Sequence, residues 1–220
     1  MIEKNLLKRI FTSLILITVL LSMFLSSFVM ISILIIISSI TFYEFNSLFL
    51  KIFKSNFLRF FFSAITLLYL FLILLILFFA ESNQNINQDL KLYFFYSIVV
   101  SINSDIGGFV VGKVFKGKKL TKISPNKTIS GSIGAFIFSL LTIPIFLNNM
   151  EIVNLKILIL ITLVISFISQ LGDLFISYLK RLAKVKDTGK ILPGHGGILD
   201  RIDGILFASP FGLLLLNLIN

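Results

Sequence analysis

The chain has 220 residues, of which 57% are hydrophobic and only 14% are charged. Its mean hydropathy of +1.03 excludes an ordinary soluble globular domain and indicates a protein that crosses a membrane several times. The formal net charge is +10, and the absence of cysteine excludes disulfide bonds.

Apolar stretches of about 20 residues, the length that crosses a bilayer as a helix, recur along the whole chain. Because the alternating pattern of a membrane β-barrel strand is absent, the sequence predicts an all-α, polytopic integral membrane protein. We expect about seven transmembrane helices, the first two joined by a tight turn. They cover residues 10–27, 28–43, 57–80, 92–112, 130–148, 152–179 and 204–219.

The chain begins with a basic segment followed by an apolar one, the order found in secretory signals. Since the apolar run continues into a second span and no A-x-A-like site precedes it, we expect a retained anchor.

Basic residues indicate the orientation of these helices. If the N-terminus is cytoplasmic, eighteen of the twenty Lys and Arg residues fall on the cytoplasmic side, and only Lys91 and Lys156 fall outside it. Loops rich in Lys and Arg stay in the cytoplasm, so we expect a multi-pass protein of the inner, cytoplasmic membrane with a cytoplasmic N-terminus. The basic loops lack the stacking aromatics of a nucleic-acid-binding module, and no nucleic-acid partner is expected.

Glycine divides the chain into two parts. None precedes Gly107, and twelve of the thirteen glycines lie between residues 107 and 204. Glycine permits close approach of the backbone and unusual dihedral angles. We therefore expect residues 1–91 to form a scaffold of three transmembrane helices and residues 92–220 to form the catalytic transmembrane region, with its site on the cytoplasmic side.

The first polar stretch of the second part covers residues 103–134. Asp105 lies in an apolar helix, where an acid is energetically unfavourable unless it is paired, hydrated or bound to metal, so a functional role is expected. Farther on, Ser124, Lys127 and Thr128 stand just before a helix N-terminus. This segment has two interpretations, a phosphate site at the helix dipole or a Ser/Thr cap with a Pro turn.

The second polar stretch, residues 169–181, places Asp173 in a long apolar helix. Ser177 follows one turn later, and Lys180 or Arg181 a further turn on, so these side chains share one face.

The third stretch, residues 186–203, holds the only histidine, His195, within a glycine-rich loop. Asp200 and Asp203 are spaced i, i+3 near a helix start, and Arg201 points elsewhere.

Carboxylates beside many cations and glycines indicate a particular chemistry. Carboxylate oxygens suit Mg²⁺, which is commonly shared with substrate phosphates, and Lys, Arg and backbone N–H groups bind phosphate oxygens. The mixture predicts a nucleotide or polyphosphate site at the cytoplasmic membrane face. The chain contains neither GxxxxGK[ST] nor GxGxxG, which argues against the common ATPase, kinase and Rossmann solutions.

Residues 177–203 read S-x2-K-R-x4-K-D-x-G-x2-L-P-x-H-G-G-I-x-D-R-I-D. This run resembles the signature of the phosphatidate cytidylyltransferase family, also called CDP-diacylglycerol synthases. Upstream, residues 105–113 are similar to the family's D-x-x-A-Y-x-x-G-R segment, and ISPNKT is similar to its S-P-x-K-T-x-E-G segment. The chain departs from these patterns with Gly108 and Phe109 for Ala-Tyr, Lys113 for Arg, and Ser130 for Glu.

The resemblance implies an enzyme, a nucleotidyltransferase of phospholipid biosynthesis, in which CTP and phosphatidic acid give CDP-diacylglycerol and pyrophosphate. It implies Mg²⁺ as the cofactor, and it leaves open a second, monovalent cation and a homodimer. The lipid phosphate would attack the α-phosphorus of CTP in line, a step that needs positioning and charge neutralisation.

The implied roles cover most of the polar residues in the three stretches. The catalytic residues expected are Asp173, Lys180, His195, Asp200, Arg201 and Asp203. The substrate-binding residues expected are Ser124, Lys127, Thr128, Ser177, Arg181, Lys186, Asp187, Gly196 and Gly197. The metal ligands expected are Asp173 and Asp200 first, then Asp203 and Asp105. For His195, contact with substrate is preferred over acid catalysis and over a structural role.

Two other functions fit part of the pattern. A CTP-dependent polyprenol or phytol kinase would share the membrane and the nucleotide but would use an alcohol as acceptor. An anion transporter would also use intramembrane acids and basic vestibules, although the concentration of charge at one face argues against it.

Overall fold

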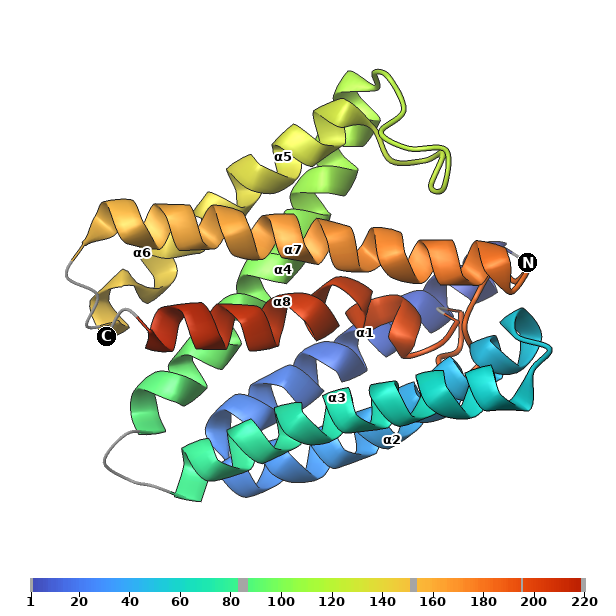
Figure 1. Ribbon diagram of the computed structural model, residues 1–220. Coiled ribbons are helices and arrows are strands. Elements are labelled where there is room, and N and C mark those ends of the chain that lie inside the picture. Colours follow the sequence, from blue (N-terminus) through green and yellow to red (C-terminus); the bar gives the residue numbers. More distant parts are fainter. Residues whose placement is uncertain (1, 83–86, 151–153, 195, 219–220) are drawn as a thin grey trace. The chain divides into compact units, whose positions relative to one another are not determined.

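The computed structural model describes residues 2–82, 87–150, 154–194 and 196–218. Within these ranges every regular element is a helix (Figure 1), as expected for an all-α protein. Five stretches of the described residues are long and apolar enough to cross a membrane, which makes the chain a multi-pass membrane protein. They are Ser27–Ile52, Asn56–Phe79, Leu90–Phe115, Ile129–Asn149 and Leu155–Leu182.

The seven expected spans all have helical counterparts, but two of them fall short of this criterion. Ile10–Leu25 is a shorter apolar helix, and the helix at Leu199–Asn217 is not among the five stretches. The last helix begins with Asp200, Arg201 and Asp203 and contains Pro210, so its apolar part is short.

The chain divides into two compact units, which group residues differently from the expected division at residue 91. The first unit comprises Met1–Asn83 and Leu179–Ile202, and the second comprises Gln84–Tyr178 and Asp203–Asn220. The glycine-rich motif loop thus belongs to the same unit as the glycine-free helices of the N-terminal part.

In the first unit, α2 packs against both α1 and α3 (Figure 1). These helices span Ile2–Leu25 (α1), Ser27–Ile52 (α2) and Asn56–Ser82 (α3). The expected tight turn between the first two is the single residue Ser26, whose φ of −139° and ψ of 123° interrupt the helical path. α2 continues nine residues past the expected end at residue 43, because its polar residues Glu44 and Asn46 find partners inside the protein.

In the second unit, α4 (Asn87–Phe115) packs closely against α5 (Ile129–Leu140). Glycine makes this approach possible: a Cβ on Gly107 would lie 2.5 Å from the carbonyl oxygen of Gly134, and a Cβ on Gly134 would lie 2.4 Å from Val111 Cβ. These glycines therefore allow two regular helices to pack closely against each other. The unusual dihedral angles expected from glycine are not needed at these two positions.

The expected helix at residues 130–148 is interrupted. α5 ends at Leu140, and a short helix α6 (Ile143–Phe146) and the 3₁₀ helix η1 (Leu147–Asn149) follow it. Pro144 lies in the first turn of α6, where its missing N–H is tolerated, whereas inside a continuous helix it would remove a hydrogen bond.

A row of buried hydroxyl groups joins α4 to α7 (Leu155–Leu182) in the second unit. Ser101 and Ser169 are 2.6 Å apart at their Oγ atoms, and Ser104 and Ser166 are 2.9 Å apart. Such pairs satisfy polar groups where lipid cannot. They hold α4 and α7 in register, and the acids Asp105 and Asp173 lie just beyond them along these two helices.

Candidate functional site

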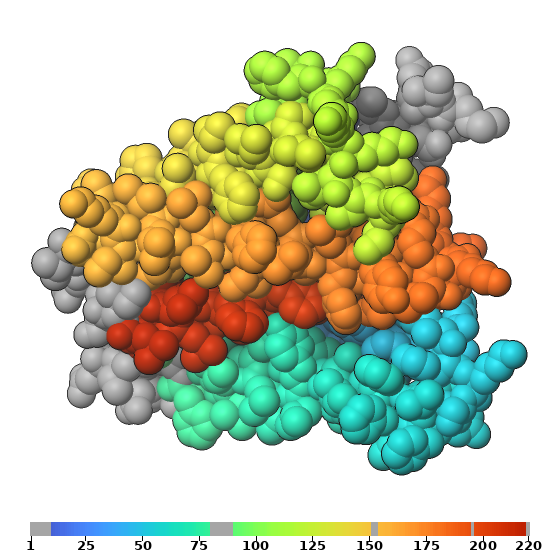
Figure 2. Space-filling model, turned by 45° about the horizontal axis from the view of Figure 1, so that its top comes forward, coloured from blue at the N-terminus to red at the C-terminus, as the bar shows by residue number. Residues whose placement is uncertain are grey.

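A cavity of about 320 Å³ opens in the second unit between α4, α5, α7 and the loop that precedes α5. In Figure 2 this loop (yellow-green) lies against α7 (orange). Five of the expected site residues line the cavity: Asp105, Ser124, Lys127, Thr128 and Asp173. The structure therefore brings together the first two polar stretches of the sequence.

The loop before α5 is held by its own backbone. The N–H of Leu120 donates to the carbonyl of Lys127 at 2.8 Å, and the N–H of Ile129 donates to the carbonyl of Lys118 at 3.0 Å. Thr128 is the N-cap of α5, because its hydroxyl accepts a hydrogen bond from Gly131 N at 3.1 Å. The cap interpretation is confirmed, and the same residue also lines the cavity.

Two departures from the family pattern, Phe109 and Lys113, contact each other on α4. Lys113 Nζ lies 5.6 Å from the centre of the Phe109 ring, a cation–π distance. A third, Ser130, donates from its hydroxyl to the carbonyl of Lys116 at 3.0 Å and so ties the start of α5 to the end of α4.

Three carboxylates and one lysine define the charge of this region. Lys127 forms an ion pair with Asp173, and Ser177 donates from its hydroxyl to Asp173 Oδ1 at 3.3 Å. Burial, with the charges of Asp173 and Asp105, raises the pKa of Asp203 to about 8. Asp203 therefore holds its proton readily and donates it to Asp173 in a hydrogen bond.

This donor set fits a hydrated divalent cation. Among the residues that the structure describes, no group of three or more Asp, Glu, His or Cys side chains could hold a metal ion. Mg²⁺, however, keeps several waters and usually takes only one or two protein carboxylates. Asp173 and Asp203 are hydrogen-bonded to each other and meet that need, because a cation could take the place of the proton that Asp203 donates to Asp173. Gly172 permits this proximity, since a Cβ there would lie 2.8 Å from the carbonyl oxygen of Asp203.

The first unit holds the other part of the motif, centred on Asp200 near the start of α8 (Leu199–Asn217). Asp200 Oδ1 accepts from Lys180 Nζ at 2.7 Å. Asp200 Oδ2 accepts from the backbone N–H groups of Thr188 at 2.8 Å and Gly197 at 3.1 Å. Burial alone would raise the pKa of Asp200, but these hydrogen bonds and the charge of Lys180 outweigh burial and lower it. Both oxygens are thus engaged within the protein.

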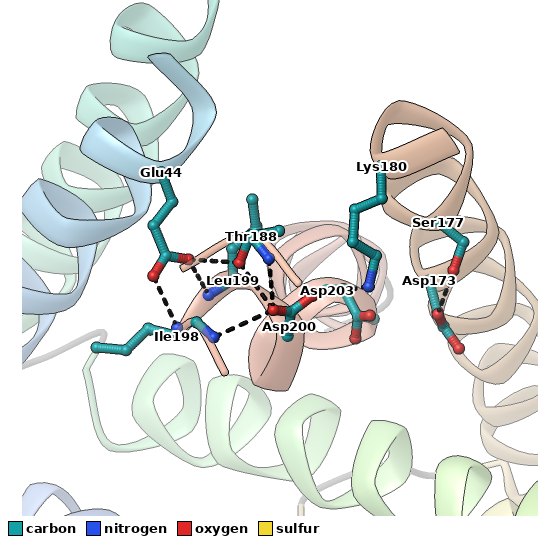
Figure 3. A network of polar contacts seen from close by, with 11 residues as sticks. Glu44, Asp173, Ser177, Lys180, Thr188, Ile198, Leu199, Asp200 and Asp203 are labelled. Carbon is teal, nitrogen blue, oxygen red and sulfur yellow. Dashed lines mark hydrogen bonds and ion pairs between the residues drawn. The ribbon is translucent and has the colours of Figure 1, made fainter. Parts of the chain in front are cut away.

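Glu44 was not anticipated as part of the site. It lies in α2, within the segment expected to be only a scaffold, and its carboxylate accepts from Thr188 Oγ1, Ile198 N and Leu199 N (Figure 3). An acid inside an apolar helix is a functional candidate by default. That signal was present in the sequence at Glu44, as it was at Asp105.

The remaining expected residues that the structure describes lie in the first unit. Arg181, Lys186, Asp187 and Arg201 are exposed there. Gly196 adopts a positive φ of +87°, and its N–H and carbonyl both bond to Leu192 across the motif loop. His195 lies outside the described residues, so its expected role stays a prediction.

Comparison with known proteins agrees with this reading of the motifs. The model of a family described as "Cytidylyltransferase family" matches residues 4–219. A protein named phosphatidate cytidylyltransferase from Bacillus subtilis (strain 168) is 46% identical over 137 residues, 61% of this chain and 51% of the relative. One of the same name from Staphylococcus haemolyticus (strain JCSC1435) is 44% identical over 126 residues, 56% of this chain and 48% of the relative. The chain spans about half the length of the curated relatives it matches.

Proposed function

This chain belongs to the cytidylyltransferase family, and we propose that it transfers the cytidylyl group of CTP to phosphatidic acid. A phosphate oxygen of the lipid attacks the α-phosphorus of CTP, and the bond from that phosphorus to the oxygen bridging to the β-phosphorus breaks. The products are CDP-diacylglycerol and pyrophosphate. The observation that carries the proposal is the cavity lined by acids and a lysine in a chain whose relatives are named for this reaction.

The cavity supplies groups for a metal-bound nucleotide. Asp173 and Asp203 would hold Mg²⁺, with Asp105 close enough to act on both through its charge. A bound Mg²⁺ supplies positive charge to phosphate oxygens and so stabilises the charge that develops on pyrophosphate. Lys127 lies at the same wall and would exchange part of its contact with Asp173 for a phosphate oxygen.

The motif residues of the first unit supply further cations. Lys180 has its ammonium held by Asp200, and a fixed ammonium needs no reorganisation when a phosphate oxygen approaches. Arg181, Lys186 and Arg201 are exposed, and long basic side chains at a membrane surface suit an anionic lipid headgroup.

The orientation follows from charge. Lys and Arg residues concentrate in loops expected to be cytoplasmic, where CTP is available, so we place the active site on the cytoplasmic side of the inner membrane. A homodimer, a second, monovalent cation and the absence of a nucleic-acid partner are kept as expectations of the same proposal.

A reconstituted assay tests the function directly. Protein purified in detergent is incubated with CTP, phosphatidic acid and Mg²⁺, and the lipid product is identified by mass. We expect CDP-diacylglycerol that requires all three additions, and its rate of formation should be lower by about 100-fold or more with the Asp173→Asn protein. A protein that ignores phosphatidic acid but phosphorylates a polyprenol or phytol would instead be the kinase. A protein that only moves anions across a vesicle membrane would be the transporter.

A further inference from the structure

Glu44 is a charged side chain buried in the part of the chain that carries no motif. It is only 1% exposed, although it lies in the 26-residue apolar helix α2, about two turns before its end at Ile52. Leaving an ionised carboxylate without partners in such surroundings would be strongly unfavourable, so its neighbours explain its presence.

Three donors converge on the Glu44 carboxylate, all from the motif loop or the start of α8 (Figure 3). Ile198 N donates to Oε1 at 3.1 Å, Leu199 N donates to Oε2 at 2.9 Å, and Thr188 Oγ1 donates to Oε2 at 2.8 Å. Ile198 and Leu199 carry N–H groups at the positive end of α8, where a negative charge is favourable. Glu44 therefore caps α8 from another helix.

A local residue would be a simpler cap than a distant acid. Ser, Thr, Asp or Asn at the N-cap usually satisfies these N–H groups, and here the cap comes from 155 residues away in the sequence. Because this cap also binds Thr188, it fixes both ends of the motif loop to α2 at once.

Thr188 connects Glu44 to the ion pair of Asp200 and Lys180. Its N–H donates to Asp200 Oδ2 at 2.8 Å, while its hydroxyl bonds to Glu44. Asp200 Oδ1 in turn holds Lys180 at 2.7 Å. A continuous set of hydrogen bonds thus runs from Glu44 through Thr188 and Asp200 to the Lys180 ammonium.

Two motif glycines are explained by this carboxylate. A Cβ on Gly189 would lie 2.5 Å from Glu44 Oε1, and a Cβ on Gly197 would lie 2.1 Å from Thr188 Oγ1 and 2.5 Å from Glu44 Oε2. None of these atoms can retreat easily, since each is hydrogen-bonded. The sequence interpretation assigned the loop glycines to the approach of backbone N–H groups to the nucleotide, whereas at these two positions the structure assigns glycine to the approach of Glu44.

We propose that Glu44 is a positioning residue of the enzyme, which orients Asp200 and Lys180 through Thr188 without touching the substrates. The inference rests on the proposed cytidylyltransferase function. Removing a supporting partner of this kind typically lowers activity by about 10–100-fold. We expect Glu44→Gln to lower kcat by that factor while the KM for phosphatidic acid changes little, because the amide has only one acceptor oxygen, and its NH₂ group must face one of the donors that now bind Oε1 and Oε2.

The matched control is Thr41→Val. Thr41 is fully buried in the same helix about one turn before Glu44, and its hydroxyl has no hydrogen-bond partner among the residues that the structure describes. Its replacement preserves shape and removes nothing from the loop, so activity stays at its original value and the melting temperature is unchanged or slightly raised.

A double-mutant cycle separates positioning from general stability. Thr188→Val should reduce kcat as Glu44→Gln does. The double variant should be about as active as the less active of the two single variants, because both substitutions act through one set of bonds. Losses that multiply in the double variant would overturn the route through Thr188. If Glu44→Gln does not fold, Thr188→Val alone decides: normal activity in it overturns the proposal, and lost kcat at an unchanged melting temperature supports it.

A second readout does not depend on catalysis. The chain contains no cysteine, so Lys190→Cys places one thiol at an exposed position of the motif loop. Its rate of reaction with a maleimide should rise severalfold when Glu44→Gln is added and should not change with Thr41→Val. An unchanged rate overturns the anchoring role of Glu44. If the original protein makes no CDP-lipid, the proposed function fails, and the thiol rate still decides whether Glu44 anchors the loop.

Discussion

Lys180 Nζ lies 2.7 Å from Asp200 Oδ1, and both side chains are largely buried, with exposed fractions of 16% and 6%. Removing one partner of a buried ion pair is strongly destabilising, because the charge of the other partner is left uncompensated. The pair therefore ties the end of α7 to the start of α8 within the first unit.

The first prediction concerns acid stability. The folded pKa of Asp200 is lowered, so its contribution to stability is complete above its unfolded pKa of about 3.9 and is lost as the pH falls through the folded value. We expect the melting temperature to drop on acidification below about pH 4. In Asp200→Asn the drop should be smaller and the stability at pH 7 lower. A pH profile identical to that of the original protein would contradict a paired Asp200.

The second prediction concerns the acids of the cavity. Asp173→Asn keeps the size of the side chain but offers a poorer ligand to a hard cation. Since a bound cation contributes several kcal/mol to charge stabilisation, turnover should fall by about 100-fold or more. The protein should still fold without Mg²⁺, with a melting temperature that is unchanged or modestly lower, because Asn keeps the shape of the side chain but loses the charge that pairs with Lys127.

The comparison for this variant is Asp187→Asn, at an exposed position of the motif loop. It should raise the CTP requirement more than it lowers the maximal rate, as expected for lost positioning. Turnover is measured against Mg²⁺ and CTP concentration. An Asp173→Asn enzyme with full activity at ordinary Mg²⁺ would refute the metal assignment.

The third prediction concerns the packing of α4 on α5. Gly107→Ala places a methyl group 2.5 Å from the carbonyl oxygen of Gly134, and overpacking of this kind typically costs about 1–3 kcal/mol. Gly108→Ala is the control, since its nearest atom would be 3.7 Å away, an ordinary contact. Thermal unfolding in detergent should therefore show a lower melting temperature for the first variant only. Equal melting temperatures would indicate that the two helices do not approach so closely.

The fourth prediction concerns orientation. Single cysteines replacing the exposed Lys118 and Lys190 should react only with reagents supplied from the cytoplasmic side. A cysteine replacing Lys156, one of two basic residues expected on the opposite side, should react only from there. Labelling of positions 118 and 156 from the same side would refute the expected orientation.

Hydropathy was sufficient to predict the helices, because each apolar stretch is long and the boundaries follow local chemistry. The helix break at Ser26 and the end of α4 at Phe115, just before the basic loop, are examples of such boundaries. The interruption near Pro144 was missed, since an apolar proline does not interrupt a hydropathy plot.

The motif residues could be found because they are close together in the sequence, and the cavity confirms that Lys127 and Asp173 meet. The part played by Glu44 could not be read in the same way. Its partner Thr188 is 144 residues away, and only folding shows which intramembrane acid faces which loop. Its isolation within an apolar helix was the only local signal.

The measurement that most directly tests the account follows the phosphorus atoms of CTP. CTP labelled at the α-phosphorus or at the γ-phosphorus is supplied with phosphatidic acid and Mg²⁺, and the lipid and aqueous phases are counted separately. Cytidylyl transfer predicts that the α label enters the lipid while the γ label appears only in pyrophosphate. Entry of the γ label into the lipid, with the α label left in CDP, would contradict the account and identify a kinase.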